Sequence, residues 1–376
     1  MLLYYLQSLL PFADQSGLMQ FIKHFSEIND GDLSRVGGKG LNLGKLTRAG
    51  FRVPQGFCVT TDAYLFSAQN LPEQNANSIK EIALVPELVA EIRAAHENLQ
   101  TATVAVRSSA TAEDLAEASF AGQQDTFLNV TPEELLEALK ACWASLWSER
   151  AIAYRETQGI APEGLAMAVV IQEMCEADVS GVLFTVSPFR EDASVIESNW
   201  GLGESVVSGA ITPDSFQVSR ETSKVMEKTI ATKREMVTAS GVREVSAAQQ
   251  DVPSLTSEQL KELTQIGLRV EDHYGQPMDI EWALTDGEFV LLQARHITTS
   301  VRGRAEATLG KSAETPKQRP SSKNPLRKFP TVSESESVEK LRQREVQRLK
   351  ACADKHGSVW CHHNIAEVLP APLPMT

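Results

Sequence analysis

PMDIEWALTDGEFVLLQARHI (277–297) is the stretch of the chain that carries most information about its fold. Two runs rich in aliphatic and aromatic residues flank the dipeptide Asp286-Gly287, which is typical of tight hairpin turns. Each run is long enough to form a strand, so the stretch predicts an antiparallel β-hairpin. The polar residues that interrupt these apolar runs are therefore the first candidates for a functional role.

Four polar residues lie within the two arms of this hairpin. Asp279 and Glu281 are on the first arm, and Gln293 and Arg295 are on the second. Because side chains alternate between the two faces of a strand, each pair shares a face. A two-residue loop would place the two pairs on opposite faces, whereas a three-residue loop beginning at Thr285 would bring all four together. We predict the loop with an odd number of residues.

These four side chains would suit a metal ion and a phosphate group. Glu281, Gln293 and Asp279 offer hard oxygen ligands of the kind that Mg²⁺ takes when it bridges nucleotide phosphates. Arg295 offers a planar fork of donors for phosphate oxygens. The alternative is an exposed hairpin face on which acid and arginine simply pair, and the spacing alone favours neither interpretation.

Two further segments could bind an anion. In VGGKGLNLG (36–44) the glycines allow a close approach of the backbone to a ligand, and Lys39 adds a positive charge. The spacing of a P-loop is absent, and a plain glycine turn is the alternative. The segment 101–110 is predicted to be a buried strand that runs into a Ser-rich turn. Arg107 lies where the strand gives way to the hydroxyls, which suits either an anion site or a structural cap of the strand.

Two weaker segments complete the candidates. Within SFAGQQDTF (119–127), Gly122 and Thr126 could offer backbone and hydroxyl contacts. The turn Gln172-Glu173-Met174 joins two apolar strands, and its backbone could read the edge of an adenine base. Each segment alone is equally well explained as an ordinary loop.

The order of apolar patterns indicates an α+β enzyme. From about Leu18 to Thr299, β-rich runs alternate with helical patterns. One long amphipathic helix is predicted over 132–156. Further strands are predicted over 165–174, 180–188 and 194–204.

Composition excludes some classes of function. The chain has 376 residues and a formal charge of −13, which makes it a poor candidate for binding nucleic acid. Its five cysteines are widely spaced without a CxxC pair, as expected for reduced thiols in a cytoplasmic protein. No apolar run reaches the length of a membrane span, and the apolar start lacks the basic region of a signal peptide.

The two ends of the chain differ in character from its centre. We expect residues 1–17 to form an N-terminal extension. Residues 300–335 are rich in Ser, Pro, Lys and Arg and are expected to form a linker. Residues 336–376 return to a helical pattern and then stop, so we expect them to be the start of a truncated following domain. Cys and His residues cluster there without a common zinc spacing.

Taken in order, eight segments resemble the N-terminal nucleotide-binding domain of the phosphoenolpyruvate synthase and pyruvate phosphate dikinase family. They cover nearly all of residues 34–299, and their order and spacing fit throughout. The resemblance implies an ATP-grasp-like fold in two lobes, 18–172 and 173–299, with ATP between them. The segments are VGGKGLNLGKL, VPQGFCVTTDAY, VAVRSSATAEDL, SFAGQQDTFLNV, GVLFTVSP, NWGLGESVVSG, MDIEWAL and LLQARHIT.

The resemblance also implies roles for single residues. The residues around the phosphates and the nucleotide would be Lys39, Arg107, Gly122 and Thr126. The adenine hinge would be Gln172, Glu173 and Met174. The Mg²⁺ ligands would be Glu281 and Gln293, with Asp279 as a further candidate. Arg295 would act on the transferring phosphates, and together with Arg107 and Lys39 it would be catalytic.

The tail WCHHNIAEVLPAPLPMT (360–376) is similar to the opening of the next domain in rifampicin-phosphotransferase-like members. Such members pass phosphate from ATP to a histidine on a swivelling domain and then to an antibiotic hydroxyl, whereas synthases pass it to pyruvate. The family's carrier-histidine motif is absent around all seven histidines of this chain. The histidine domain and the small-molecule acceptor would therefore lie outside it. The alternative function is a non-catalytic ATP-binding module.

Overall fold

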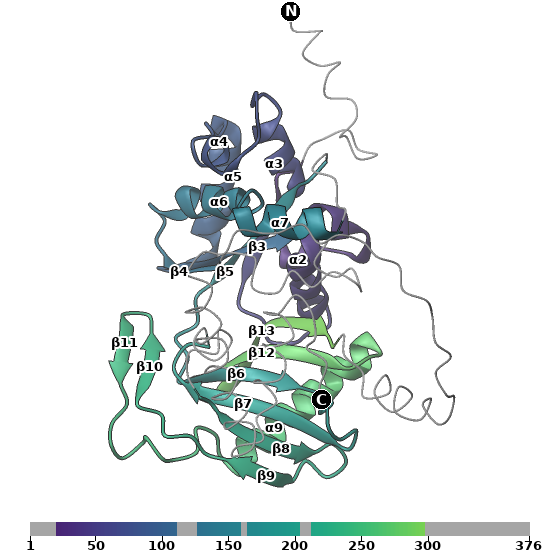
Figure 1. Cartoon of the computed structure of the whole chain (residues 1–376), viewed down its shortest axis with the longest axis vertical. Helices are drawn as coiled ribbons and strands as arrows, with labels where there is room; N and C mark the ends of the chain where they lie inside the picture. The colour runs from purple at the N-terminus through teal and green to yellow at the C-terminus, as the bar shows by residue number, and fades with distance from the viewer. Residues whose placement is uncertain (1–19, 111–125, 159–163, 204–211, 298–376) are drawn as a thin grey trace, which may run out of the picture. The chain divides into compact units, whose positions relative to one another are not determined.

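A computed structural model describes residues 20–110, 126–158, 164–203 and 212–297 (Figure 1). Apart from residues 188–191, these residues belong to one compact unit. Its architecture is mixed α/β, built on two main antiparallel sheets and a small separate hairpin. The predicted N-terminal extension (1–17), linker (300–335) and start of a following domain (336–376) lie outside the described residues.

The first sheet has five strands in the order β1-β2-β5-β3-β4, and every neighbouring pair is antiparallel. Strand β5 is buried along most of its length, as its run of Met, Ala, Val and Ile requires. The strands are β1 Ile22–His24, β2 Gly56–Val59, β3 Val104–Ala110, β4 Thr126–Val130 and β5 Met167–Glu173.

Helices cover both faces of this sheet. One face packs alternate strand residues, such as Val106 and Ile171, against helices around the fully buried Trp143. The other face packs Cys58 and Val170 against α2 Leu33–Arg48, which also contacts the second sheet at β13. The helices of the first face are α3 Thr61–Ala68, α4 Ala76–Lys80, α5 Pro86–Leu99 and α6 Leu135–Ser145. Two 3₁₀ turns, η1 Phe25–Glu27 and η2 Asp30–Asp32, precede α2.

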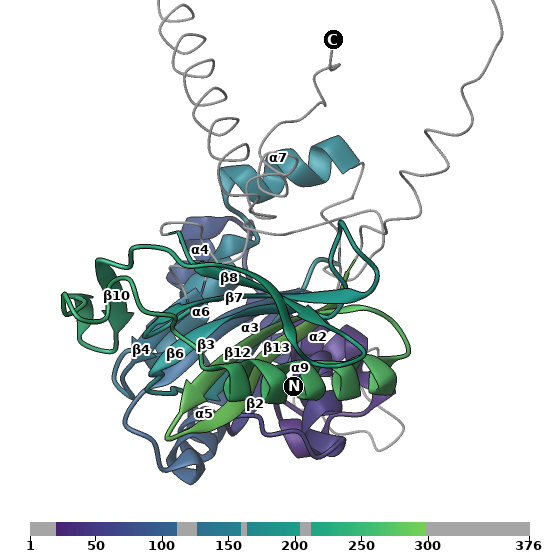
Figure 2. The same ribbon diagram turned by 90° about the horizontal axis from the view of Figure 1, so that it is seen from below.

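The second sheet has six antiparallel strands in the order β13-β12-β6-β7-β8-β9. Its apolar face packs on α9 Ser257–Tyr274 around the buried Trp282, and Figure 2 shows α9 lying across the strands. The strands are β6 Val179–Phe184, β7 Ala193–Trp200, β8 Asp214–Ser219, β9 Val225–Thr229, β12 Met278–Thr285 and β13 Glu288–His296. The small hairpin pairs β10 Glu235–Thr238 with β11 Gly241–Glu244.

The prediction of a single long helix over 132–156 is wrong. The chain forms α6, which ends at Ser145, and a separate α7 Glu149–Gln158. Between them, the amide groups of Leu146, Trp147 and Ser148 bond to carbonyls three residues earlier, so the helix tightens into 3₁₀ geometry and stops. The Ser148 hydroxyl then accepts from the amide of Ala151 and starts α7.

Two sequence expectations concern thiols and membranes. Within the described residues, Cys58, Cys142 and Cys175 form no disulfide, and burial raises the pKa of Cys175 to about 11. A thiol with so high a pKa is protonated at neutral pH and is a poor nucleophile. Among the described helices, none combines the length and the apolar character that crossing a membrane requires.

Candidate functional site

The hairpin loop is shorter than we predicted. Thr285 pairs with Glu288, so the loop contains only Asp286 and Gly287. Both have positive φ, 51° and 78°, as a tight two-residue turn requires. A regular hairpin with a two-residue loop would place the pair Asp279 and Glu281 and the pair Gln293 and Arg295 on opposite faces of the sheet.

A β-bulge restores the shared face. The pairing shifts by one residue beyond Glu281, and Leu292 on the facing strand is left without an opposite residue. As a result Glu281 lies opposite Gln293, and Asp279 lies opposite Arg295. Residues directly opposite each other in a sheet share a face, so all four polar side chains point the same way. The expected grouping is present, but the bulge produces it and not the loop.

Arg107 joins the first sheet to this bulge. From β3, its guanidinium donates through Nη2 to Oε2 of Glu281 at 2.7 Å and through Nη1 to the carbonyl of Leu292 at 3.0 Å. The side chains of Arg107 and Glu281 are 11% and 22% exposed. The bulge therefore has a second role, because it presents a carbonyl oxygen beside a carboxylate to one guanidinium. Thr126 lies opposite Arg107 on β4.

The second acid of the hairpin is also paired. Nε of Arg295 donates to Oδ2 of Asp279 at 2.8 Å. The Asp279 side chain is 10% exposed and that of Arg295 is 51% exposed. Each hairpin acid thus has its own arginine, and Arg295 extends from the pair towards solvent.

Several buried oxygens on this polar face have no hydrogen-bond donor among the described residues. Oε1 of Gln293 is one, and both carboxylate oxygens of Glu197 are others. Glu197 on β7 lies in the same cross-strand row, since Val182 of β6 is opposite both Glu281 and Glu197. The side-chain oxygens of Asn199 and Gln217 lack donors too, although their amide groups donate to Glu235 and Glu227.

Glu197 is the residue that the sequence analysis missed. It is fully buried, and this burial, followed by the charge of Asp279, raises its carboxyl pKa from 4.5 to about 8. The sequence signal for Glu197 is an acidic residue in the middle of the apolar run SVIESNW, a segment from which only a strand was predicted. Buried acceptors without donors are uncommon in folded proteins, and their concentration here makes this face the candidate ligand-binding surface.

Lys39 lies in a helix and not in a plain glycine turn, which was the alternative for this segment. Gly37, with φ 68° and ψ 177°, breaks α2, and the helix resumes immediately after it. Lys39 lies in the first turn of the resumed helix, where amide groups and the helix dipole favour an anion. A side chain at Gly37 would collide with the backbone of Ser109, so only glycine fits.

The Ser109 hydroxyl holds this break in place. It donates to the carbonyl of Val36 at 2.7 Å and accepts from the amide of Gly40 at 3.2 Å. Of the hydroxyls that follow Arg107, this one is therefore engaged in structure and is not free for an anion. Gly122 lies outside the described residues.

The predicted adenine hinge lies at the end of β5. Gln172 is buried, and its Nε2 donates to the carbonyl of Pro54. The amides of Glu173 and Met174 already bond to the carbonyls of Gln55 and Thr103. A base at this edge would have to use the carbonyl groups or displace one of these bonds.

Sequence comparison identifies the class to which this mixed α/β unit belongs, a class of nucleotide-binding domains. The model of the family "Pyruvate phosphate dikinase, AMP/ATP-binding domain" matches residues 33–316. The chain belongs to this family.

Curated relatives include synthases and an antibiotic-modifying enzyme. A probable phosphoenolpyruvate synthase of Methanocaldococcus jannaschii is 41% identical over 77% of this chain and 27% of its own length. The phosphoenolpyruvate synthase of Pyrococcus furiosus is 37% identical over 74% and 44%, respectively. A rifampicin phosphotransferase of Streptomyces sviceus is 41% identical over 74% and 36%. The chain thus spans less than half the length of these relatives.

Proposed function

We propose that this unit is the ATP-binding, phosphate-donating part of a dikinase-type phosphotransferase with an ATP-grasp-like arrangement of two lobes, 18–172 and 173–299. ATP would lie over the polar face of the second sheet. The observation that carries the proposal is the bulge, which aligns Glu281 with Gln293 and presents them beside Arg107 of the first sheet. Family membership supports the nucleotide as ligand.

The residues present fit Mg²⁺. Oε1 of Gln293 is a buried oxygen without a donor, Glu281 supplies a carboxylate opposite it, and Asp279 supplies another two residues along. Hard oxygen donors of this kind hold Mg²⁺ when phosphate oxygens and water complete the shell. An ion held by Glu281 and Gln293, with Asp279 nearby, would supply positive charge that offsets the charge of the phosphates.

Arg107 would act as an exchangeable partner of Glu281. Its Nη2 holds Oε2 of Glu281. Phosphate oxygens would accept from the Arg107 guanidinium as the carboxylate does, and Arg107 would then leave Glu281 available to hold the ion. We therefore infer that Arg107 moves its charge-assisted hydrogen bond from Glu281 to phosphate when metal and nucleotide bind together.

The remaining candidates would surround the nucleotide. Lys39, at the start of the resumed helix, would hold phosphate in the ground state. Arg295, on a strand and half exposed, would stabilise charge as it develops on the transferring group. Contacts to the nucleotide would also come from Gly122, Thr126, Gln172, Glu173 and Met174.

The phosphate acceptor would lie outside the described unit. A phosphoryl or pyrophosphoryl group would pass to a histidine on a separate swivelling domain and then to a small molecule. Pyruvate is one candidate and an antibiotic hydroxyl another, because relatives carry both names. Catalysis would consist mainly of positioning and charge stabilisation, with the reaction taking place in the cytoplasm.

Isotope exchange between ATP and its products, with a separate histidine domain added to the full chain, tests this proposal. We expect exchange that depends on Mg²⁺ and is lost in Glu281→Ala. Tight ATP binding without any exchange would instead identify a non-catalytic ATP-binding module.

A further inference from the structure

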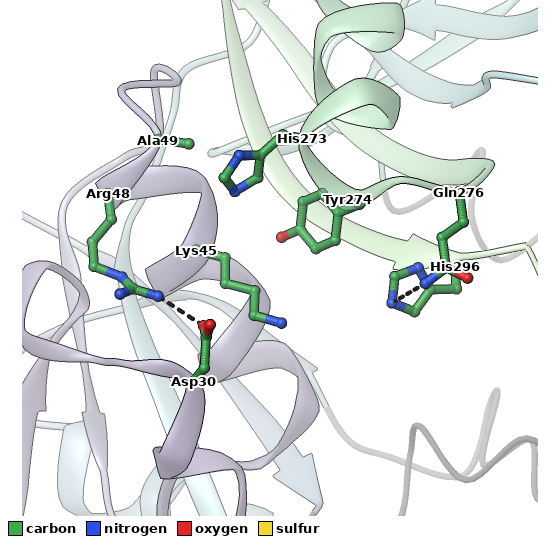
Figure 3. Close-up of a pocket in the computed structure, with 8 residues that line it drawn as sticks. All are labelled: Asp30, Lys45, Arg48, Ala49, His273, Tyr274, Gln276 and His296. Atoms are coloured by element: carbon green, nitrogen blue, oxygen red, sulfur yellow. Dashed lines mark hydrogen bonds and ion pairs between the residues drawn. The ribbon is translucent and has the colours of Figure 1, made fainter.

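A cavity lies at the ends of α2, α9 and β13, and none of the four polar residues of the hairpin face lines it. Its volume is about 430 Å³, which is within the usual range for small-molecule sites. Residues from four parts of the fold line it, namely η2, the end of α2, the end of α9 and the end of β13 (Figure 3). They are Asp30, Lys45, Arg48, Ala49, His273, Tyr274, Gln276 and His296.

The lining is rich in hydrogen-bond donors. It includes two cations, two imidazoles and one amide, against a single carboxylate. That carboxylate, Asp30, is 76% exposed and accepts from Nη2 of Arg48 at 2.9 Å. The excess of positive charge and donors therefore matches an anion.

Lys45 is the centre of this lining. Its ammonium lies 5.8 Å from the centroid of the Tyr274 ring, and in Figure 3 it extends into the space between Asp30 and His296. Cations in the last turn of a helix ordinarily offset the helix dipole. That role does not explain why Lys45 lies over an aromatic ring from another helix and lines a cavity.

The aromatic wall of the cavity is held in place. The Tyr274 hydroxyl donates to the carbonyl of Asn42 at 3.1 Å, and its ring meets those of His273 and His296 edge to face. Nε2 of Gln276 lies 2.9 Å from Nε2 of His296. Since an amide NH₂ only donates, the imidazole nitrogen accepts, and a neutral His296 carries its proton on Nδ1.

We propose that this cavity binds a small molecule through its phosphate group. A phosphate has three terminal oxygens and can accept from donors on several sides at once, whereas a carboxylate offers two in one plane. Lys45 and Arg48 come from α2 and His273 comes from α9, so donors reach the cavity from two elements, which favours the phosphate. The cavity also has room beyond a single phosphate, so the ligand is larger than inorganic phosphate.

Calorimetric titration of pyrophosphate into the full chain tests the proposal. The loss of one charged hydrogen bond should weaken binding about tenfold in Lys45→Met. Ala49→Glu, at an exposed position, should abolish binding by repulsion, and Asp30→Asn should strengthen it. The matched control is Lys261→Met, an exposed position on α9 outside the cavity, which should bind as the unmodified chain does.

The nucleotide face is the competing location for pyrophosphate. Arg107→Met should leave binding at the cavity intact, so loss in Arg107→Met together with normal binding in Lys45→Met and Ala49→Glu would overturn the proposal. Malonate binding as tightly as pyrophosphate would overturn the assignment to phosphate. Unfolding temperatures of all variants guard against loss of fold, and Ala49→Glu retains the test if Lys45→Met is unstable.

Discussion

Two polar clusters within the second half of the unit differ in how completely their hydrogen bonds are satisfied. Asp214 and Lys233 form a fully buried ion pair at 2.7 Å. Asp214 also accepts from the amide of Ala231 and from the amide and hydroxyl of Ser254. On the hairpin face, by contrast, Glu197 and Gln293 have buried oxygens without donors.

The difference in hydrogen bonding distinguishes a structural cluster from a candidate functional one. The Asp214 cluster ties the segments after β9 and before α9 to the start of β8, and its acceptors have their donors within the chain. The buried acceptors of the hairpin face have fewer donors within the described residues. We infer that the first cluster serves stability and that the second belongs to the ligand-binding surface, and variants of each should fail in different ways.

The largest effect is expected on the stability of the Asp214 cluster. Asp214→Ala leaves the buried Lys233 ammonium without its partner, so the free energy of unfolding should fall by about 3–5 kcal/mol. Chemical denaturation measures it, with the exposed Glu221→Ala as a control that should change stability by at most about 0.5 kcal/mol. If both variants were equally stable, the cluster would not be structural.

Arg295→Ala should slow phosphate transfer without unfolding the domain. Loss of a donor that follows developing charge should lower the transfer rate by about 10²-fold or more, with ATP affinity nearly unchanged. Single-turnover phosphorylation of an added histidine domain measures the rate, and calorimetry measures the affinity. A variant that lost affinity alone and kept its rate at saturating ATP would make Arg295 a binding residue.

Lys39→Ala should have the opposite signature. The lost charged hydrogen bond should weaken ATP binding by about 1–3 kcal/mol while the rate at saturation stays close to normal. Calorimetry measures the ATP affinity, and single-turnover phosphorylation of the added histidine domain measures the rate. An unchanged affinity with a reduced rate would exchange the roles that we assign to Lys39 and Arg295.

Glu197→Gln should remove a pH dependence of stability. An acid whose pKa is raised on folding, here from 4.5 to about 8, keeps its proton in the folded state over a range in which the unfolded state has lost it. Stability should therefore fall as pH rises from about 5 to 8, and the slope should be shallower in Glu197→Gln. Urea denaturation at several pH values measures this, and identical slopes would mean that Glu197 titrates normally.

The sequence was a good guide to strands and a poor guide to the reasons for their register. The hairpin and its four polar residues followed from alternation around Asp286-Gly287. The bulge at Leu292 did not, because its partner Arg107 lies 185 residues away in the chain. Glu197 was missed for the same reason, since its burial depends on neighbouring strands and not on its own segment.

We propose that the hairpin face holds a metal-bound nucleotide. The most direct measurement is ATP affinity with and without Mg²⁺, by calorimetry, in the unmodified chain and in Glu281→Ala. We predict that Mg²⁺ strengthens ATP binding in the unmodified chain, and that this gain disappears in Glu281→Ala while the variant stays folded, because the change removes one of the two main oxygen ligands and Asp279 is held by Arg295. An equal gain from Mg²⁺ in a folded Glu281→Ala would contradict the assignment of the metal to this face.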